Sequence, residues 1–475
     1  MNRKTKIICT IGPACSGLET LKAMMLAGMD IARLNFSHGT HESHYNTIEI
    51  LRQASLETGK RIGILQDLCG PKIRLGRLDG EFTLESGGLV ALTYGESSDD
   101  GSLPVNYPHL VEDLAQGASI LLADGLVELM VEEKRSGSLV CRILNGGVVT
   151  SHKGVNLPLS KLRIPAFTQK DEKDLMFGLE VGVDFVAMSF VRDEKDLAPI
   201  LEILADQQKN RPMLLAKIEK PRAVESLDNI LAVVDGIMVA RGDLGVETPY
   251  EKLPMMQKRI ITATRKAAKP VITATQMLRS MVDHPRPTRA ETTDTANAIL
   301  DGTDAVMLSE ETAMGAYPVE AVRALNKIAL ATEGEIDYEK YMDEPVSPLL
   351  APIPAEITKS ACSLSNDLGA RCMVTITSFG YTPRMIARLR PQAPVLAISD
   401  DESILRQLQL TWGVITVLGP EISEQDGMLE FVFNTVRDKD LCSEGDKLAL
   451  VYVNPYDEQG KENVIKIINV PGILV

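Results

Sequence analysis

Hydrophobic positions along this chain form eight short, nearly continuous runs rich in β-branched residues, and segments with helical spacing lie between them. Continuous apolar character, rather than alternation, is typical of strands in a parallel sheet covered on both faces. The predicted strands are 6–12, 30–36, 61–67, 184–190, 213–219, 236–242, 269–275 and 304–309, and the helical segments include 18–27, 42–57, 171–180, 194–206 and 252–267.

This repeating order predicts an α/β fold, a (β/α)₈ TIM barrel. A doubly wound open sheet is the structural alternative. Polar residues follow nearly every predicted strand. That distribution favours the barrel, whose functional groups gather at the carboxyl ends of its strands, hereafter the rim.

The strand–helix order is interrupted once, between Asp67 and Asp184, by a long interval rich in glycine and β-forming residues. It predicts a small β-barrel domain inserted at 73–163, which leaves 1–72 and 164–340 for the TIM barrel. An insertion at a strand-to-helix loop lies at the rim, where it can act as a lid. An inert decoration is the alternative.

The segment from Glu335 to Pro354 is rich in proline and acidic residues and predicts a linker. Beyond it, helical and strand patterns alternate again. A third domain of α/β type, at 355–475, is therefore expected.

Composition restricts the partners. The net charge of −15 and the aromatic content of 4% argue against a nucleic acid, which needs a basic face and stacking platforms. No uncharged apolar stretch approaches the length that spans a bilayer, and the basic N-terminus lacks a signal-peptide core. The seven cysteines form no CxxC pair. A cytoplasmic protein with neither nucleic-acid nor membrane partners is expected.

The polar residues at the strand ends predict the chemistry. Two carboxylates, Glu219 and Asp243, and two cations, Lys217 and Arg241, follow the fifth and sixth predicted strands. A parallel sheet would bring them to one rim, and this mixture suits a divalent metal together with a phosphate. An ordinary salt-bridge network is the alternative. The backbone N–H groups of 241–245, RGDLG, could hold a carboxylate, unless this segment is a plain tight turn.

Several long motifs of this chain, in this order, match those of a known protein family. They are TKIICTIGP (5–13), ARLNFSHG (32–39), DLCGPKIR (67–74), HKGVNLP (152–158), IPAFTQKD (164–171), AKIE (216–219), DGIMVARGDLGVE (235–247), ITATQML (272–278), PRPTRAE (285–291), DGTDAVMLSEETAMGAYP (301–318) and RPQAPVLAIS (390–399). Over essentially its whole length the chain resembles the pyruvate kinases.

The resemblance implies a barrel, an inserted β lid and a C-terminal α/β domain, assembled as a homotetramer. It implies transfer of the phosphoryl group of phosphoenolpyruvate to ADP, giving ATP and pyruvate in the last step of glycolysis, with Mg²⁺ or Mn²⁺ as cofactor. Two rivals remain open: a Mg²⁺-dependent lyase or mutase of the phosphoenolpyruvate/pyruvate barrel type, and a non-catalytic sugar-phosphate sensor.

Carried over by motif, the resemblance also implies roles for single residues. Glu219 and Asp243 would bind Mg²⁺, Lys217 would stabilise the transferring phosphoryl group, and Arg33 would grip the phosphate of phosphoenolpyruvate. Thr275, or water near it, would protonate the enolate. The substrate carboxylate would be held by Gly242, Asp243 and Thr275. The nucleotide would be contacted by Asn35, His38, Arg74 and Lys153.

The chain departs from the family pattern at Lys72. Many pyruvate kinases hold K⁺ at positions matching Asn35, Ser37, Asp67 and the carbonyl of Leu68, and carry GPEIR where this chain has the bacterial-type variant GPKIR. A lysine ammonium is a fixed monovalent cation on a long stem, so Lys72 can replace the ion. We expect activity without K⁺; the alternative is that Lys72 points to solvent and K⁺ still binds.

A second departure lies in the C-terminal domain. The resemblance assigns a phosphorylated allosteric effector to the loop 377–382, at Thr377, Ser378, Gly380 and Thr382, before a helix carrying Arg384, Arg388 and Arg390. Phe379 stands where a serine is common, which weakens the case for a sugar bisphosphate. A sugar monophosphate or nucleotide is the hypothesis, and a loop that only closes a strand–helix unit is the alternative.

Overall fold

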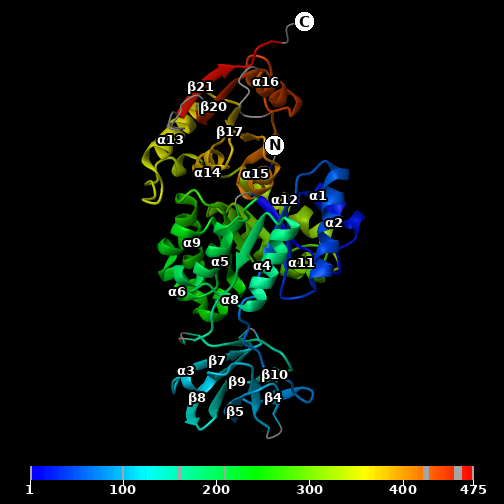
Figure 1. Cartoon of the computed structure of the whole chain (residues 1–475), viewed down its shortest axis with the longest axis vertical. Coiled ribbons are helices and arrows are strands. Elements are labelled where there is room, and N and C mark those ends of the chain that lie inside the picture. The colour runs from blue at the N-terminus through cyan, green and yellow to red at the C-terminus, as the bar shows by residue number, and fades with distance from the viewer. Residues whose placement is uncertain are drawn as a thin grey trace.

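The computed structural model describes residues 3–98, 101–123, 125–158, 160, 162–207, 210–420, 427–453 and 463–472. The C-terminal part, the barrel and the insert follow one another along the long axis of the molecule (Figure 1). The first two residues of the predicted barrel segment and the last three of the predicted C-terminal domain lie outside the described residues.

The central sheet is a closed eight-stranded parallel barrel, as predicted, and not an open sheet. Each predicted strand is present but shorter, at its amino end, its carboxyl end or both. In the order β1-β2-β3-β12-β13-β14-β15-β16 the strands are Lys6–Thr10, Ile31–Asn35, Gly63–Asp67, Phe185–Met188, Met213–Ile218, Gly236–Ala240, Val271–Ala274 and Ala305–Leu308.

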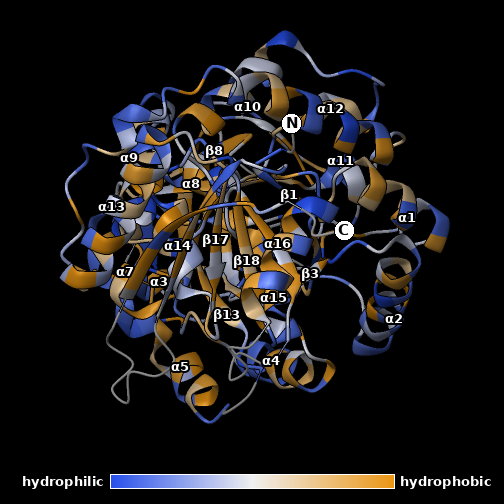
Figure 2. Ribbon diagram, turned by 90° about the horizontal axis from the view of Figure 1, so that it is seen from above, coloured by the Kyte–Doolittle hydropathy of each residue, from blue (hydrophilic) through white to orange (hydrophobic). Residues whose placement is uncertain are grey.

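Helices surround the barrel, with hydrophobic faces turned to the strands and polar faces outward (Figure 2). Capping boxes start some of them: Thr168 accepts from the N–H of Asp171, and Thr288 from that of Glu291. The helices are α1 Leu18–Ala27, α2 His41–Thr58, α4 Gln169–Val181, α5 Ala198–Ala205, α6 Pro221–Glu225, α7 Leu227–Val233, α8 Arg241–Glu247, α9 Leu253–Lys266, α10 Arg289–Leu300, α11 Glu310–Ala313 and α12 Pro318–Glu333.

The insert after β3 is all-β apart from one helical turn. A six-stranded sheet in the order β11-β7-β8-β9-β5-β6 lies beside a two-stranded sheet, β10-β4. Its strands alternate buried and exposed positions, as expected for a sheet with one solvated face. The elements are β4 Phe82–Leu84, β5 Leu89–Tyr94, β6 Leu103–Val105, α3 Leu110–Asp113, β7 Ser119–Leu122, β8 Val127–Arg135, β9 Ser138–Asn145, β10 Gly147–Val149 and β11 Val155–Asn156.

The C-terminal part is a five-stranded sheet in the order β19-β18-β17-β20-β21, with only β21 antiparallel. Its first helix, α13, starts at Pro352, inside the segment predicted as a linker, because proline is well suited to a first helical turn. The elements are α13 Pro352–Asp367, β17 Cys372–Ile376, α14 Tyr381–Ala387, β18 Val395–Ser399, α15 Glu402–Gln407, β19 Val414–Leu418, α16 Met428–Asp438, β20 Lys447–Val453 and β21 Asn463–Asn469.

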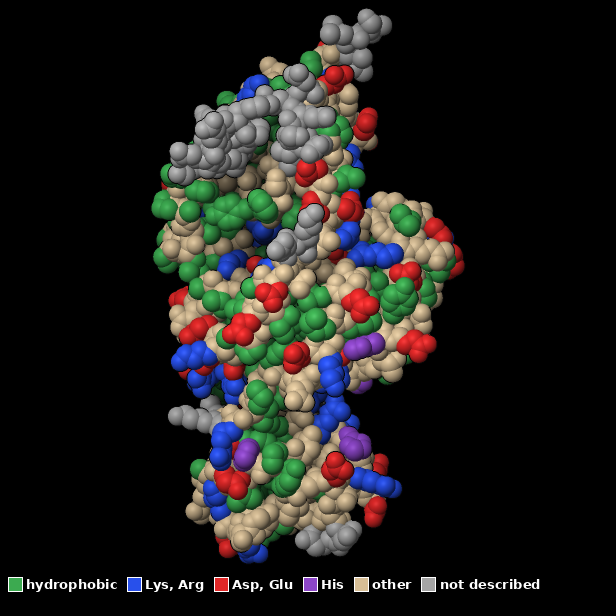
Figure 3. Space-filling model, in the orientation of Figure 1, with side chains coloured by type: hydrophobic (Ala, Val, Ile, Leu, Met, Phe, Trp, Pro, Cys, Tyr) green, Lys and Arg blue, Asp and Glu red, His purple; other side chains and the backbone are tan. Residues whose placement is uncertain are grey.

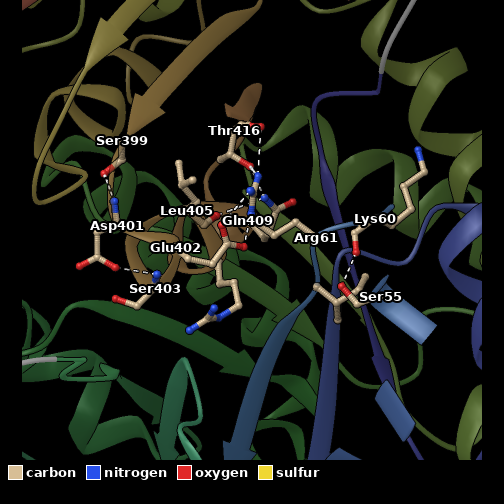
Figure 4. Close-up of polar contacts among 12 residues, drawn as sticks. Ser55, Lys60, Arg61, Ser399, Asp401, Glu402, Ser403, Leu405, Gln409 and Thr416 are labelled. Carbon is tan, nitrogen blue, oxygen red and sulfur yellow. Dashed lines mark hydrogen bonds and ion pairs between the residues drawn. The ribbon is translucent and has the colours of Figure 1, made fainter. Parts of the chain in front are cut away.

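The C-terminal part is attached to the amino ends of the barrel strands, hereafter the floor. Arg61, just before β3, donates to Glu402 at 2.8 Å and to the Thr416 hydroxyl at 2.8 Å (Figure 4). Asp184, just before β12, accepts from Arg406 at 2.7 Å. The insert and the C-terminal part therefore occupy opposite ends of the barrel. Each helix among the described residues is too short or too polar to cross a bilayer.

Candidate active site

Asp67 is the centre of the ion pairs at the rim. It ends β3, beside Asn35 of β2, and is almost completely buried. Arg33 Nε and Nη2 both lie 2.7 Å from its Oδ2, and Lys217 Nζ lies 3.2 Å from its Oδ1. Burial alone would raise the pKa of this carboxyl, but the Lys217 and Arg33 cations outweigh it and hold the pKa below its usual value. Asp67 is therefore an ionised anchor for two cations.

Lys217 lies near the end of β13 with its ammonium inside the cluster. Its Nζ is 2.9 Å from Glu219 Oε1 and donates to Ser189 Oγ at 2.8 Å. Burial lowers the pKa of a lysine, yet Asp67 and Glu219 together raise the pKa of Lys217 above its ordinary value. The group thus stays charged where an anionic substrate would meet it.

Glu219 follows β13 and is buried at the rim. Its Oε2 accepts the backbone N–H of Phe190 at 2.8 Å. Burial, although partly opposed by Lys217, raises the pKa of Glu219, and the neighbouring Asp243 carboxylate raises it further. A cation between the two carboxylates would relieve that repulsion.

Among the described residues no three His, Cys, Asp or Glu side chains gather into a metal-ligand cluster. Two carboxylates and an accessible cleft nevertheless fit Mg²⁺, which takes one or two carboxylates and completes its octahedron with water and substrate oxygens. The donor set would not suit a metal that requires a cage built only from protein groups.

The segment RGDLG is neither a plain turn nor a free loop: it is the start of α8, directly after β14. The Gly242 N–H donates to Thr275 Oγ1 at 2.8 Å. Thr275 itself follows β15 with a positive φ of 71°, a rare conformation for a β-branched residue and one found at functional sites. A backbone N–H donor and a hydroxyl that accepts from it thus meet across neighbouring strand ends.

Among the described residues Arg241 forms no ion pair with Glu219 or Asp243, whereas Lys217 pairs with Glu219. The Arg241 guanidinium donates to Asp294 at 2.7 Å and to the Thr275 carbonyl at 2.8 Å. It fixes the backbone of Thr275, a role that its sequence position alone did not indicate.

A cleft of about 550 Å³ opens between the rim and the insert and is lined by His38, Arg74, Lys153 and Asp243, among others. Lys and Arg side chains gather at this narrow part of the molecule (Figure 3). Partial burial lowers the pKa of His38, and the nearby Lys72 and Arg74 lower it further. The cleft is therefore electropositive on this side, which suits a polyphosphate.

Asn35 is the one predicted nucleotide contact that does not line this cleft. Its Oδ1 accepts the backbone N–H of Ser37 at 3.1 Å and so shapes the turn after β2.

Lys72 reaches the predicted monovalent-cation positions at one point. Its Nζ donates to Ser37 Oγ at 2.8 Å, although the side chain as a whole is exposed. The Leu68 carbonyl accepts from Ser189 Oγ at 2.8 Å, and Asp67 is bound by Arg33 and Lys217.

Three residues of the site were missed in the sequence. Thr10 accepts from Arg33 Nη1 at 2.8 Å, Ser189 bridges Lys217 to a backbone carbonyl, and Lys220 pairs with Glu247 at 3.0 Å in the cleft. Thr10 and Ser189 lie within two residues of the carboxyl ends of predicted strands, so the rule used for the other rim residues could have found them. Lys220 carries no signal beyond its place after Glu219.

The predicted effector loop is closed on itself. The Gly380 N–H donates to Thr377 Oγ1 at 2.9 Å, and Arg384 Nη2 donates to the Phe379 carbonyl at 2.8 Å. Gly380 has a positive φ of 69°, and the Phe379 side chain is 78% exposed. Ser378 belongs to this loop, and Thr382 lies in the first turn of α14.

The two further arginines do not face this loop. Arg388 donates to the Ala355 carbonyl at 3.0 Å, and Arg390 to Asp304 at 3.1 Å on the barrel floor.

The charged rim groups, the carboxylates compatible with Mg²⁺ and the electropositive cleft beside the insert are typical of a phosphotransferase on a TIM barrel. Comparison with known proteins identifies the family within this class. Residues 2–322 match the family model described as "Pyruvate kinase, barrel domain", and residues 355–468 match "Pyruvate kinase, alpha/beta domain".

Similar proteins agree along the whole chain. A pyruvate kinase of Geobacillus stearothermophilus is 43% identical over 98% of this chain and 80% of its own length, and one of Agrobacterium vitis is 41% identical over 99% and 97%. A crystal structure of a pyruvate kinase from Cryptosporidium parvum superposes with a TM-score of 0.93 at 36% identity, covering 99% of this chain and 96% of that one. The chain belongs to the pyruvate kinase family. The predicted fold and enzyme class are thereby confirmed, against the lyase or mutase alternative.

Proposed function

We propose that this chain transfers the phosphoryl group of phosphoenolpyruvate to ADP at the rim of its barrel, giving ATP and pyruvate in the last step of glycolysis. The observation that carries the proposal is the buried Lys217 ammonium, held 3.2 Å from Asp67 and 2.9 Å from Glu219 beside an electropositive cleft. An ammonium with a raised pKa is a permanent charge for a transferring phosphoryl group.

Glu219 and Asp243 would hold Mg²⁺ or Mn²⁺, which would neutralise charge on the transferring phosphate. Arg33 grips the phosphate of phosphoenolpyruvate, and Asp67 keeps its guanidinium oriented. Gly242, Asp243 and Thr275 hold the carboxylate end, where the Gly242 N–H and the Thr275 hydroxyl now bond to each other. Thr275, or a water beside it, returns a proton to the enolate.

His38, Arg74 and Lys153 contact the nucleotide phosphates from the two sides of the cleft, with Asn35 shaping the turn that carries His38. The insert at 73–163 acts as the lid of the barrel at 1–72 and 164–340, and the α/β domain at 355–475 is regulatory. Closure of the lid would exclude water from the phosphoryl transfer.

Lys72 makes K⁺ unnecessary in this bacterial-type enzyme. Its contact with Ser37 Oγ supports this, because Ser37 is one of the four positions, with Asn35, Asp67 and Leu68, that would otherwise hold the ion. An ammonium supplied by the chain needs no dissolved cation.

Three further properties follow from the resemblance. The enzyme is cytoplasmic and forms a homotetramer, and a phosphorylated effector binds the loop with Thr377, Ser378, Gly380 and Thr382. Light scattering tests the tetramer, which a monomeric mass would contradict. Kinetics with a panel of sugar phosphates and AMP test the effector, which an unchanged velocity curve would contradict.

The direct test of the reaction measures ATP and pyruvate separately from phosphoenolpyruvate, ADP and Mg²⁺. Equal amounts of the two products are expected. Pyruvate without ATP would mean hydrolysis rather than transfer. Lys327→Met, on the exposed face of α12, serves as a control for variants of the rim lysine.

A further inference from the structure

A small cavity between the barrel floor and the C-terminal part is surrounded by positive charge. It has a volume of about 10 Å³, which is room for a single water-sized sphere. Asp304 and Thr411 line it too. The cationic side chains that line it are Arg265, Lys269, Arg384, Arg388 and Arg390.

Carboxylates balance only part of this charge. Arg390 donates to Asp304 at 3.1 Å, and Arg265 pairs with Glu344. In the described part of the chain, the hydrogen bonds of the other three cations go to backbone carbonyls: that of Ala355 for Arg388, that of Phe379 for Arg384, and those of Leu231 and Val234 for Lys269.

The nearest other carboxylates belong elsewhere or act from a distance. Asp235, which is close to both Lys269 and Arg384, is paired with Arg211 at 2.9 Å. Glu356 affects Arg388 electrostatically and forms no ion pair with it among the described residues. Positive charge is therefore in excess around the cavity.

Several donors here are also unused. The Nε atoms of Arg265, Arg388 and Arg390 are buried and have no hydrogen-bond partner among the described residues. The three side chains are more than nine-tenths buried, at 3%, 5% and 1% exposure. A buried donor without a partner costs on the order of 1–3 kcal/mol, and more when it is charged.

The arginines also repel one another. Burial lowers the pKa of Arg265, and the charge of Arg390 lowers it further. Burial also lowers the pKa of Arg388, and the charge of Arg265 lowers that pKa further. Such a group of cations is stable in a dry interface only with a counter-charge.

We propose that this cavity binds a monatomic anion of the halide class, held by the arginines between the barrel floor and the C-terminal part. The volume of about 10 Å³ admits one small sphere, which favours a monatomic anion over a phosphate or sulfate. Guanidinium groups are weakly hydrated and suit a soft, weakly hydrated anion. A neighbouring cavity of about 360 Å³ shares Lys269 and Arg384 with this one.

The anion would join two parts of the chain. Arg265 belongs to α9 of the barrel, whereas Arg384, Arg388 and Arg390 belong to α14 and the residues after it. Halide binding would therefore fix the C-terminal part to the floor of the barrel, without touching the rim.

Crystals of the full chain soaked in bromide test the proposal on the unaltered protein. The expected result is an anomalous bromide peak in the cavity, within contact distance of Arg265, Arg388 and Arg390. A cavity that holds water, with bromide only at surface positions, would overturn it.

Thermal unfolding gives an independent readout. In chloride, compared with gluconate at equal ionic strength, Tm should rise with the logarithm of the chloride concentration, by about 3 °C near a hundredfold excess over Kd. Arg388→Gln should lose most of this difference, whereas Arg323→Gln, an exposed residue of α12, should keep it. Equal salt responses in Arg388→Gln and wild type would refute the site, as would protection by phosphate or sulfate but not by halides.

Discussion

At the scale of single residues, the site depends on buried charges that hold one another. Asp67 orders both Arg33 and Lys217, and Lys217 in turn reaches Glu219. Each group is costly to bury alone. Pairing keeps the pKa of Asp67 low and that of Lys217 high, whereas burial and Asp243 raise the pKa of Glu219.

Lys217→Met tests the charge that meets the phosphoryl group. We expect kcat to fall by about 10²–10³, the loss typical of one transition-state electrostatic contact. Steady-state kinetics beside Lys327→Met and a circular-dichroism check of folding measure it. Near-normal turnover in the folded variant would remove Lys217 from catalysis.

Glu219→Gln tests the metal. Loss of one of two carboxylates should raise the Mg²⁺ concentration needed for half-maximal activity at least about tenfold, because a neutral amide is a weaker ligand for a hard cation. A Mg²⁺ titration at saturating substrates measures this. An unchanged titration curve would mean that the metal binds elsewhere.

Lys72→Glu tests the resident cation. The variant replaces the ammonium on Ser37 Oγ by a carboxylate, so its activity should become dependent on added K⁺. Lys173→Glu, on the exposed face of α4, makes the same charge change away from the site and should leave the salt response as in wild type. If Lys72→Glu is equally active without K⁺, the ammonium is not replacing an ion.

At the scale of elements, the strand ends were predictable and the details of the loops were not. Continuous apolar runs located all barrel strands, and the residues that follow them do form the rim. The segment RGDLG begins α8 although its two glycines disfavour a helix, because tertiary contacts such as that from Gly242 to Thr275 override propensity. The positive φ of Thr275 has no local sequence signal.

Gly242→Ala separates helix stability from substrate binding. A Cβ at this position would lie 3.4 Å from Thr275 Oγ1, so the fold tolerates it and the helix gains up to about 1 kcal/mol. The methyl group would, however, occupy space next to the donors assigned to the substrate carboxylate. We expect an unchanged or higher Tm with a KM for phosphoenolpyruvate raised about tenfold, the equivalent of one lost hydrogen bond.

Gly245→Ala in the same helix is the matched control. Its Cβ would meet only the end of the Leu253 side chain, at 3.3 Å, so its KM should stay near that of wild type. Equal KM values in the two variants would contradict the placement of the carboxylate at Gly242.

At the scale of the whole molecule, the barrel separates the insert from the C-terminal part. The insert covers the rim, where the chemistry is proposed (Figure 1). The C-terminal part is bonded to the floor through pairs such as Arg61 with Glu402 (Figure 4) and Arg406 with Asp184. The three-part order was predictable from breaks in the hydrophobic pattern. The floor contacts were not, because they join residues hundreds of positions apart whose types are ordinary for exposed loops.

The most direct test of the proposed function measures ADP-dependent pyruvate formation from phosphoenolpyruvate and Mg²⁺, with K⁺ in one assay and tetramethylammonium at equal ionic strength in the other. We predict equal rates, which is the result expected when Lys72 supplies the monovalent charge to a working pyruvate kinase site. Activity only with K⁺ would contradict the role of Lys72, and no ADP-dependent pyruvate in either assay would contradict the proposed reaction.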